Sequence, residues 1–442
     1  MNTEDDQTAK IDYMADESPP LFITLLQGLS HLSLYPVAFA FPVMLVQSAG
    51  VSVADAISLS QITFLTMGIA TILMTLKPEI LGSGYLCPAT ACPSFFTASL
   101  LAAKSGGLGL LSGMLIFTGI FQAVFAKAIS RVKFLLEPEI MGVVVLMIGM
   151  TALSITAPIF AGRPQAGIPF DLKSFLIGLS TFLIMLIPVI RKNNFWRRYS
   201  VLAGVVFGIS ASYILHISNP MINPPDNLAW FSFPPVGSFG WSFQVSLIPV
   251  FIIAGIASVL KTAACISACR EINGESTDDS SLDTISGGML SVGLSNIISG
   301  LAGGMGNSAA AGNIGLSFAT GISSRRVGFA LGGMLILLSL SPGLAGEIVD
   351  IATPVVGACL LYVTSFMLVL AFRLLTAKAF DARKIFTLGI ALSFGFCVDV
   401  MPELFSGAGT STISDRLNLA TILAIALSLI FRIGQPKTMK KS

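Results

Sequence analysis

Residues 307–321 read NSAAAGNIGLSFATG. The stretch is apolar enough to lie in a bilayer, but it is shorter than the roughly 20 residues that a spanning helix needs. Its glycines and its polar first residues also argue against one unbroken helix. The features of the rest of the chain indicate why such a segment lies in the interior of the sequence.

The composition of the chain is that of a membrane protein. It has 442 residues, of which 54% are hydrophobic and only 11% charged, whereas a soluble domain carries about 25% charged residues. Because so few charges cannot cover a water-facing surface, the sequence predicts an all-α polytopic membrane protein. The net charge of +2 gives no indication of a nucleic-acid partner. The six cysteines lie in apolar stretches, which favours packing over metal binding, and neither a metal nor a cofactor is expected.

Twelve apolar segments are long enough to span a bilayer as helices. Two further apolar segments, 87–103 and 307–321, are shorter and are broken by Pro or Gly. With both included, the sequence predicts fourteen transmembrane segments. The twelve full-length candidates are 21–47, 55–76, 109–129, 139–161, 172–190, 199–217, 244–268, 284–303, 327–345, 353–376, 383–399 and 417–432.

The basic residues support the count of fourteen. If the N-terminus is cytosolic, 20 of the 25 Lys and Arg residues fall on the cytosolic side and Lys261 falls inside a span. This is the asymmetry that the positive-inside rule describes, and leaving out the two short segments would largely destroy it. We therefore expect both segments to cross. The chain is then a multi-pass protein of the plasma (cell inner) membrane with both termini in the cytosol.

The two short segments open two similar stretches of chain, 87–122 and 307–342. Each stretch has a polar-tipped segment, a glycine-marked connection and a long helix that carries GMLI, at 113–116 and at 333–336. The next helix opens with PEIMG in the first case and with PVVG in the second. The matches are short, but their order is the same, so they indicate an internal repeat.

The two copies lie about 220 residues, or seven predicted spans, apart. An odd number of spans gives them opposite orientations, which is the inverted-topology repeat of many secondary transporters. In such folds broken segments meet near the bilayer midplane, where half-helix N-termini offer N–H groups and partial positive charge to a substrate. The predicted organisation is a cytosolic tail over 1–20, a first seven-span repeat over 21–217, an extracellular loop over 218–243, a second, inverted seven-span repeat over 244–432 and a basic cytosolic tail over 433–442.

The stretch GNIGLSFATG, at 312–321, resembles the signature of the nucleobase–ascorbate transporter family, also called the uracil/xanthine permeases. The stretch LEPEIMGVVVLMIGM, at 136–150, resembles the fifth span of that family, and the likeness extends over about 21–430. The signature residues in this chain are Asn313, Gly315, Thr320 and Gly321.

This resemblance implies fourteen spans in two inverted sevens. It also implies a core domain that carries the substrate and a gate domain that tends to form a homodimer. The chemistry that it implies is uptake of a nucleobase driven by a proton or sodium gradient.

The chain departs from the family pattern at three positions. Members usually carry Gln, Glu or Pro directly before the signature Asn, and this chain has Gly312. In the eighth span they carry a Glu that hydrogen-bonds the base and, four residues on, an Asp or His; Ala257 and Lys261 match these positions. No Asp or Glu lies between Trp241 and Arg270, so a shifted alignment restores neither carboxylate.

Lys261 is the only charged residue well inside a predicted span, where a Lys costs about 2.5–3.5 kcal/mol. It lies about 17 residues, or roughly 25 Å, into a helix that begins near Gln244. Either it snorkels toward the cytosol at the helix end, or it lines the substrate cavity. In the cavity an ammonium favours an anionic ligand and can itself exchange a proton. Lys261 is thus predicted both to bind the substrate and to couple the ion.

Other side chains are also candidates for substrate contact. Ser94 and Phe95 match the position where the family stacks an aromatic ring on the base and offers a backbone N–H, although Phe95 can equally be core packing. Tyr35 of the first span can face the cavity, and the Asn313 amide can bond the substrate or tie to the eighth span. The predicted substrate-binding residues are Lys261, Asn313, Gly312, Ser94, Phe95, Ala257 and Tyr35.

The leading hypothesis is a secondary active symporter that takes up a nucleobase such as xanthine, uracil or urate, in part as the anion. The alternatives are a transporter of another small organic or inorganic anion held by Lys261, and a passive anion channel. No clustered catalytic residues, nucleotide-binding loop or attached soluble domain indicates an enzyme.

Overall fold

The computed structural model is predominantly helical. It describes residues 11–35, 41–42, 45, 49–50, 52–77, 81–163, 170–190, 194–217, 229–275, 281–349, 351–401, 403 and 415–433. The main elements are α1 (Leu21–Leu32), α3 (Val53–Thr75), β1 (Ala89–Ala91), η1 (Pro93–Phe95), α4 (Phe96–Ala128), α5 (Pro138–Phe160), α6 (Leu172–Ile190), α7 (Asn194–Ile214), α8 (Ile248–Ile272), α9 (Ser281–Ala302), β2 (Asn307–Ala309), α10 (Ala311–Thr320), α11 (Arg325–Ser339), α12 (Pro342–Val349), α13 (Thr353–Thr376), α14 (Ala382–Val400) and α15 (Arg416–Ile433).

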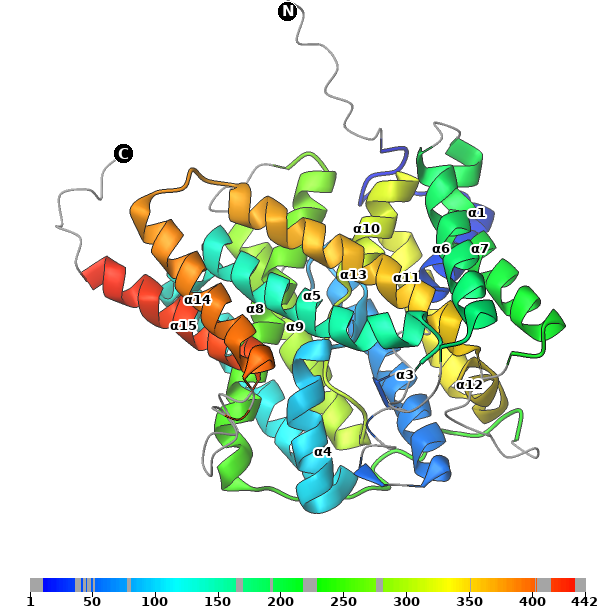
Figure 1. Ribbon diagram of the computed structural model, residues 1–442, viewed down its shortest axis with the longest axis horizontal. Helices are drawn as coiled ribbons and strands as arrows, with labels where there is room; N and C mark the ends of the chain where they lie inside the picture. Colours follow the sequence, from blue (N-terminus) through cyan, green and yellow to red (C-terminus); the bar gives the residue numbers. More distant parts are fainter. Residues whose placement is uncertain are drawn as a thin grey trace, which may run out of the picture.

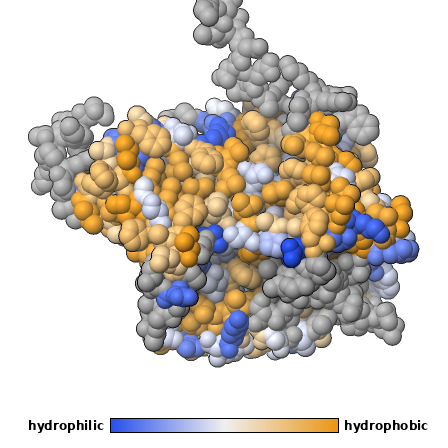
Figure 2. Space-filling view, viewed as in Figure 1, coloured by the Kyte–Doolittle hydropathy of each residue, from blue (hydrophilic) through white to orange (hydrophobic). Residues whose placement is uncertain are grey.

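The helices have the length and surface of a membrane protein. Six of the described helices are long and apolar enough to cross a bilayer, and three shorter ones are also apolar. Figure 2 shows a broad hydrophobic face with hydrophilic residues mainly toward its edges. Large apolar side chains such as Leu183, Phe372 and Ile430 are exposed, as a lipid-facing surface requires. The prediction of a polytopic helical membrane protein is confirmed.

The helices form two groups by their packing. In the first helix group, which comprises α1, α3, α4 and α8–α11, the main contacts join α4 to α9 and α3 to α11. Both contacts bring glycines against the facing backbone. A Cβ at Gly68 of α3 would lie 2.8 Å from the Gly332 oxygen of α11, and a Cβ at Gly119 of α4 would lie 2.8 Å from the Gly293 oxygen of α9. Small residues permit such close helix contact within a membrane.

The second helix group comprises α5–α7 and α13–α15. Its central contact joins α5 to α13. Figure 1 shows α14 and α15 side by side at one end of this group and α6 and α7 at the other, with α5 and α13 running between them. The two groups meet where α13 packs on α10 and where α5 packs on α8.

The two short segments are interrupted, as the sequence predicts, but each begins with a strand that an all-α prediction lacks. β1 and β2 pair antiparallel, with Ala89 opposite Ala309 and Ala91 opposite Asn307. β1 leads into η1 and α4, and β2 leads into α10. The pairing satisfies backbone groups that no helix could satisfy here. Each strand has only three residues, too few to give a recognisable alternation.

Several predicted boundaries move. The segments expected at 87–103 and 109–129 both run into α4, but Gly106 and Gly107 leave the helical conformation there, so α4 consists of two helices that meet at the predicted glycine connection. Gly107 has φ +73°, which favours glycine. The helix expected over 327–345 ends at Ser339, and α12 begins after it at Pro342, because a proline does not continue the preceding helix. Of the first predicted span, 21–47, α1 covers the beginning, and much of the remainder lies outside the described residues.

The close contact of α4 and α9 predicts the effect of Gly119→Ala. The new Cβ would lie 2.5 Å from the Ile297 backbone nitrogen, so the helices must separate, and we expect a loss of about 1–3 kcal/mol in stability. Thermal unfolding of the purified protein measures this. The control is Gly333→Ala in α11, where a Cβ meets nothing within 4 Å and where Ala should stabilise the helix by about 0.5–1 kcal/mol. Equal melting temperatures for the two variants would contradict the packing.

Candidate functional site

The two interrupted segments bring two helix starts to one place. η1 begins at Pro93 and α10 begins at Ala311, and no side chain caps either N-terminus. The backbone N–H groups of a first helical turn have no partner within their helix, and they give the helix start a partial positive charge. The strand pair before them holds both starts in register. The arrangement favours a ligand that accepts hydrogen bonds or carries negative charge.

A small cavity of about 30 Å³ adjoins these helix starts. Such a volume holds roughly two waters, which is too little for a purine ring, so the site is closed in this conformation. Its walls come from both helix groups. The lining residues are Leu34, Tyr35, Phe41, Thr90, Ala91, Pro93, Ala152, Lys261, Ala310, Ala311, Asn313, Leu360, Val363, Thr364 and Met367.

Lys261 lies at this cavity and does not snorkel to the surface. α8 begins at Ile248, four residues later than expected, so Lys261 is only about 20 Å along the helix and near its middle. Its side chain is 1% exposed. Its Nζ donates to Ser308 Oγ at 3.0 Å and lies 3.7 Å from Cys92 Sγ. Lys261 therefore links the residues around the two helix starts.

The environment of Lys261 has no balancing carboxylate. Its hydrogen-bond partners are a hydroxyl and a cysteine sulfur, and no ion pair joins Lys261 to an acidic residue anywhere in the described ranges. A buried charge without a counter-charge is costly. Two helix starts at the same place add further positive potential. A bound anion would relieve this imbalance.

Two other predicted residues line the cavity and also brace it. Tyr35 donates its hydroxyl hydrogen bond to the Ala89 oxygen at 2.7 Å, so it ties the segment that follows α1 to β1. Asn313 Nδ2 lies 3.1 Å from His31 Nδ1 and 3.3 Å from the His31 oxygen. The Asn313 amide therefore ties α10 to α1. Among the described residues, neither of these bonds reaches the eighth span, and contact of Asn313 with a substrate stays a prediction.

The remaining predicted residues lie behind the cavity lining. Phe95 is fully buried in the hydrophobic core, with its ring filling the space beside Gly306. The Ser94 hydroxyl lies 2.9 Å from Cys92 Sγ, and Ala257 is fully buried. Their contact with a substrate stays a prediction.

Gly312 is explained by packing. A Cβ there would lie 2.6 Å from Val363 Cγ2 on α13. The longer side chain that the family pattern leads one to expect would therefore collide with the second helix group. The absence of that side chain lets α13 approach α10 closely.

A buried amide network supports β2 from behind. Asn296 of α9 accepts from the Asn307 backbone nitrogen at 2.6 Å and donates to the Asn307 oxygen at 3.1 Å. Asn296 also donates to Gln122 Oε1 at 2.7 Å, and Gln122 donates to the Gly255 oxygen at 3.1 Å. The Asn296 side chain thus acts as an added strand partner. A lone Asn in an apolar helix gives no sequence signal for this role.

Sequence reasoning missed the contribution of α13 to the cavity. Leu360, Val363, Thr364 and Met367 follow the spacing of one helix face. In the sequence this stretch stands out only as a predicted span, 353–376, whose start matches the first repeat. The apolar pattern of a spanning helix cannot tell a face that borders a cavity from one that packs on another helix.

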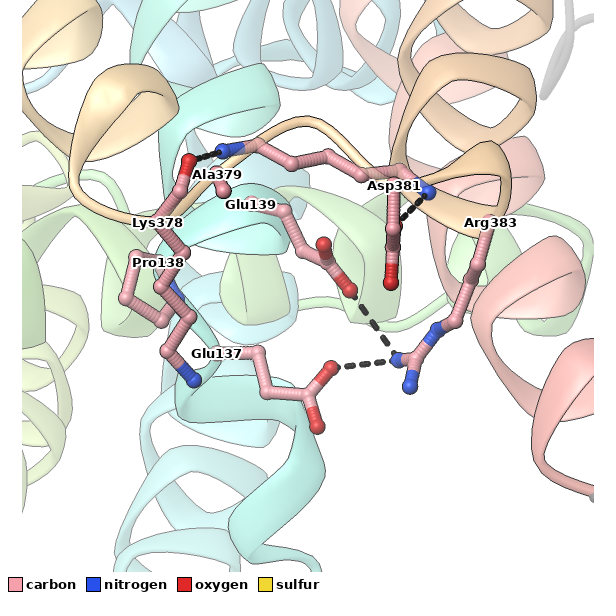
Figure 3. A pocket seen from close by; sticks show the side chains of 8 residues that line it. Glu137, Pro138, Glu139, Lys378, Ala379, Asp381 and Arg383 are labelled. Carbon is pink, nitrogen blue, oxygen red and sulfur yellow. Dashed lines mark hydrogen bonds and ion pairs between the residues drawn. The ribbon is translucent and has the colours of Figure 1, made fainter.

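A second polar cavity, of about 170 Å³, lies where α5 and α14 begin. Figure 3 shows the Arg383 side chain reaching toward Glu137 and Glu139. Its guanidinium bonds Glu137 at 2.6 Å and Glu139 at 3.0 Å, and Arg432 of α15 also pairs with Glu137. Through these ion pairs the cluster holds three helix ends together.

The described residues contain no group of His, Cys, Asp and Glu that could hold a metal ion. All six cysteines are free, and five of them are buried. The site therefore consists of an ammonium, neutral polar groups, helix starts and apolar walls.

Opposed interrupted helices around a central cavity in an apolar helical body define a membrane transport protein. A family model described as the permease family, of xanthine/uracil type, matches residues 23–404, and the chain belongs to this family. The predicted family is confirmed.

Three known proteins illustrate the likeness. Xanthine permease XanP of Escherichia coli (strain K12) is 24% identical over 445 residues, which cover 96% of this chain and 95% of XanP. Uric acid permease PucJ of Bacillus subtilis (strain 168) is 24% identical over 428 residues, which cover 93% of each chain. The transmembrane domain of the cyanobacterial bicarbonate transporter BicA aligns with a TM-score of 0.51 at 16% identity, over 95% of this chain and 99% of that chain. The last likeness concerns the fold alone.

The contact between Gly312 and Val363 predicts a compensating pair of substitutions. Gly312→Ala should lower stability by about 1–3 kcal/mol because the stiff Val363 side chain cannot move aside. Val363→Ala should remove most of that loss in the double variant, and a double-mutant cycle of melting temperatures measures the coupling. Additive effects of the two substitutions would show that the residues do not meet.

The ionic cluster predicts that Arg383→Gln destabilises the protein. Arg383, Glu137 and Glu139 are only 17%, 20% and 14% exposed, so loss of the cation should cost about 2–3 kcal/mol. Arg373→Gln is the matched control, since its pair with Glu271 is 52% and 61% exposed and should contribute about 0–1 kcal/mol. Thermal unfolding compares the variants, and an equal loss for both would refute the structural role of the cluster.

Proposed function

We propose that the chain is a secondary active transporter that takes up a nucleobase such as xanthine, uracil or urate, in part as the anion. The family supports a nucleobase, because XanP and PucJ carry xanthine and uric acid in their names. The ammonium of Lys261 supports the anionic form, because no carboxylate pairs with it among the described residues. A proton or sodium gradient would drive the uptake.

The observation that carries this proposal is the position of Lys261 between the two helix starts. A planar base that has lost a proton can place its negative edge against the ammonium and against the first-turn N–H groups. Its aromatic faces suit the apolar side chains that line the rest of the cavity. The proposal gives Lys261 a second role, which is exchange of the coupling proton. Lys261 is the one residue on the described part of α8 that lines the cavity.

A second candidate substrate is another small organic or inorganic anion. The same unbalanced ammonium favours it, since an ammonium attracts negative charge whatever molecule carries the charge. A passive anion channel is the third possibility, and saturable, gradient-driven accumulation separates it from a transporter.

The architecture that suits this function is fourteen spans in two inverted sevens, divided over 21–217 and 244–432. Matching contacts in the two halves support it. The contact of α3 with α11 is the counterpart of the contact of α4 with α9, and the contact of α6 with α7 is the counterpart of the contact of α14 with α15. In this proposal the first helix group is the core domain and the second is the gate domain. Both termini are cytosolic, the protein lies in the cell inner membrane, and the gate domain forms a homodimer.

The closed cavity supports transport by relative movement of the two domains. Its core side consists of residues that follow α1, of β1, η1, α8 and the start of α10, and its gate side consists of α5 and α13. Separation of α13 from α10 would open room for a purine. Rocking of one rigid domain against the other would then expose the site to each side of the membrane in turn.

Uptake into proteoliposomes tests the proposal. With an imposed proton or sodium gradient, the wild type should accumulate radiolabelled xanthine, uracil or urate. Lys261→Met should lose at least tenfold in uptake, because a charge-assisted contact contributes roughly 1.5–3 kcal/mol, and Lys261→Arg should retain part of it. The exposed Lys127→Met is the control and should transport normally.

Absence of accumulation for every nucleobase would refute the proposed substrate class. Uptake of only non-nucleobase anions, with the same dependence on Lys261, would favour the second candidate. Wild-type binding and uptake by Lys261→Met would contradict the electrostatic role.

A further inference from the structure

The gate side of the cavity is apolar apart from one hydroxyl. Within the described residues, α5 and α13 contribute Ala152, Leu360, Val363, Thr364 and Met367 to the lining. Only Thr364 among them has a side chain that forms hydrogen bonds. A nucleobase has polar atoms around its whole edge, so an edge turned away from Lys261 would otherwise face hydrocarbon.

The Thr364 hydroxyl is buried and has no hydrogen-bond partner in the described parts of the chain. The residue is 1% exposed, and its Oγ1 is unpaired. Threonines in helices commonly bond the carbonyl one turn back. Thr156 of α5 does so with the Ala152 oxygen at 2.7 Å, and Thr376 of α13 does so with the Phe372 oxygen at 2.8 Å. An unpaired buried hydroxyl is unfavourable, and here it adjoins the cavity.

Thr364 differs from other unpaired hydroxyls by its position. Thr181, Thr387 and Thr421 are also buried and unpaired, but they lie in α6, α14 and α15 and do not line this cavity. Thr364 lies across the cavity lining from Lys261 and Asn313, which belong to α8 and α10. It is therefore the polar group that the gate side presents to whatever occupies the site.

We propose that Thr364 is a substrate-binding residue that hydrogen-bonds the polar edge of the nucleobase facing α13 and so determines which bases are accepted. This inference rests on the proposed function and names the second contact of the same site. A hydroxyl can donate to a ring oxo group or accept from a ring N–H. Bases that lack a polar group on that edge leave the hydroxyl unpaired and bind less tightly.

The contact also joins the substrate to both helix groups. A base held by Lys261 on α8 reaches Thr364 only when α13 lies close to α10. The hydrogen bond therefore forms when α13, after separating to admit the base, closes over it, and it favours this base-filled closed state over the open one. A base without the matching group gains less from closure.

Equilibrium binding of radiolabelled xanthine, hypoxanthine, uracil and urate to the purified full chain tests the proposal. Thr364→Val keeps the shape and removes the hydroxyl, and it should raise Kd roughly fivefold to tenfold for the bases that use the contact. The loss should differ between xanthine and hypoxanthine, or between xanthine and urate, because these bases differ in their oxo groups. Thr364→Ser should bind within about twofold of the wild type, because it keeps the hydroxyl.

Two control variants remove a hydroxyl that has an intrahelical partner. Ser365→Ala changes the next residue of α13, which is exposed and bonds the Leu361 oxygen. Thr156→Val changes a buried threonine of α5. Both should leave the order of preference among the bases unchanged. If Thr364→Val does not fold, Thr364→Ala gives the same test.

The outcomes distinguish a failure of the proposed function from a failure of the role of Thr364. Wild-type protein that binds none of the bases refutes the proposed function, and the role of Thr364 with it. Wild-type binding with unchanged Kd values in Thr364→Val refutes the role of Thr364 alone. An equal loss for every base, not restored by Thr364→Ser, would show that Thr364 acts only through packing.

Discussion

The pairing of β1 with β2 is the constraint on which the site depends. A helix interrupted within a bilayer leaves backbone groups that lipid cannot satisfy. The two interrupted segments satisfy part of this demand for each other through their strands, and Asn296 extends the pairing on one side. Because the strands are joined, the two helix starts that follow them are fixed at one point. Lys261 then adds its charge between Ser308 and Cys92.

The first helix group supports the two helix starts rigidly, and the second helix group closes the cavity beside them. Within the first group, α3 meets α11 and α4 meets α9 through glycines that leave little space. Gly312 has a related effect at the boundary between the groups, since it allows Val363 to approach α10. The cavity of about 30 Å³ is the consequence. Its polarity is uneven: the first group contributes the ammonium and amide, and the second contributes almost only hydrocarbon.

The sequence predicts the helical membrane fold and its family because these depend on strong signals. Low charge, the distribution of Lys and Arg, and two apolar segments too short to span are readable without coordinates. Lys261 was found for the same reason, since one charge in an apolar helix is conspicuous. The strands were not predicted, because three residues such as Ala89–Ala91 show no periodicity. Thr364 was not predicted either, because a threonine in a spanning helix normally bonds its own backbone. The burial of Phe95 beside Gly306 was not predictable either, because it depends on a contact between distant segments.

The glycine contacts of the first helix group have a consequence for how the chain can vary. Where backbone touches backbone, no side chain remains that could shift to absorb a substitution. Altered volume at Gly68 or Gly119 would be transmitted along whole helices to the paired strands, although neither residue is near a ligand. Changes in volume are then absorbed chiefly by the exposed apolar side chains of the molecule, such as Leu183, Phe372 and Ile430. The glycine contacts between helices and the exposed apolar surface should therefore tolerate substitution very unequally.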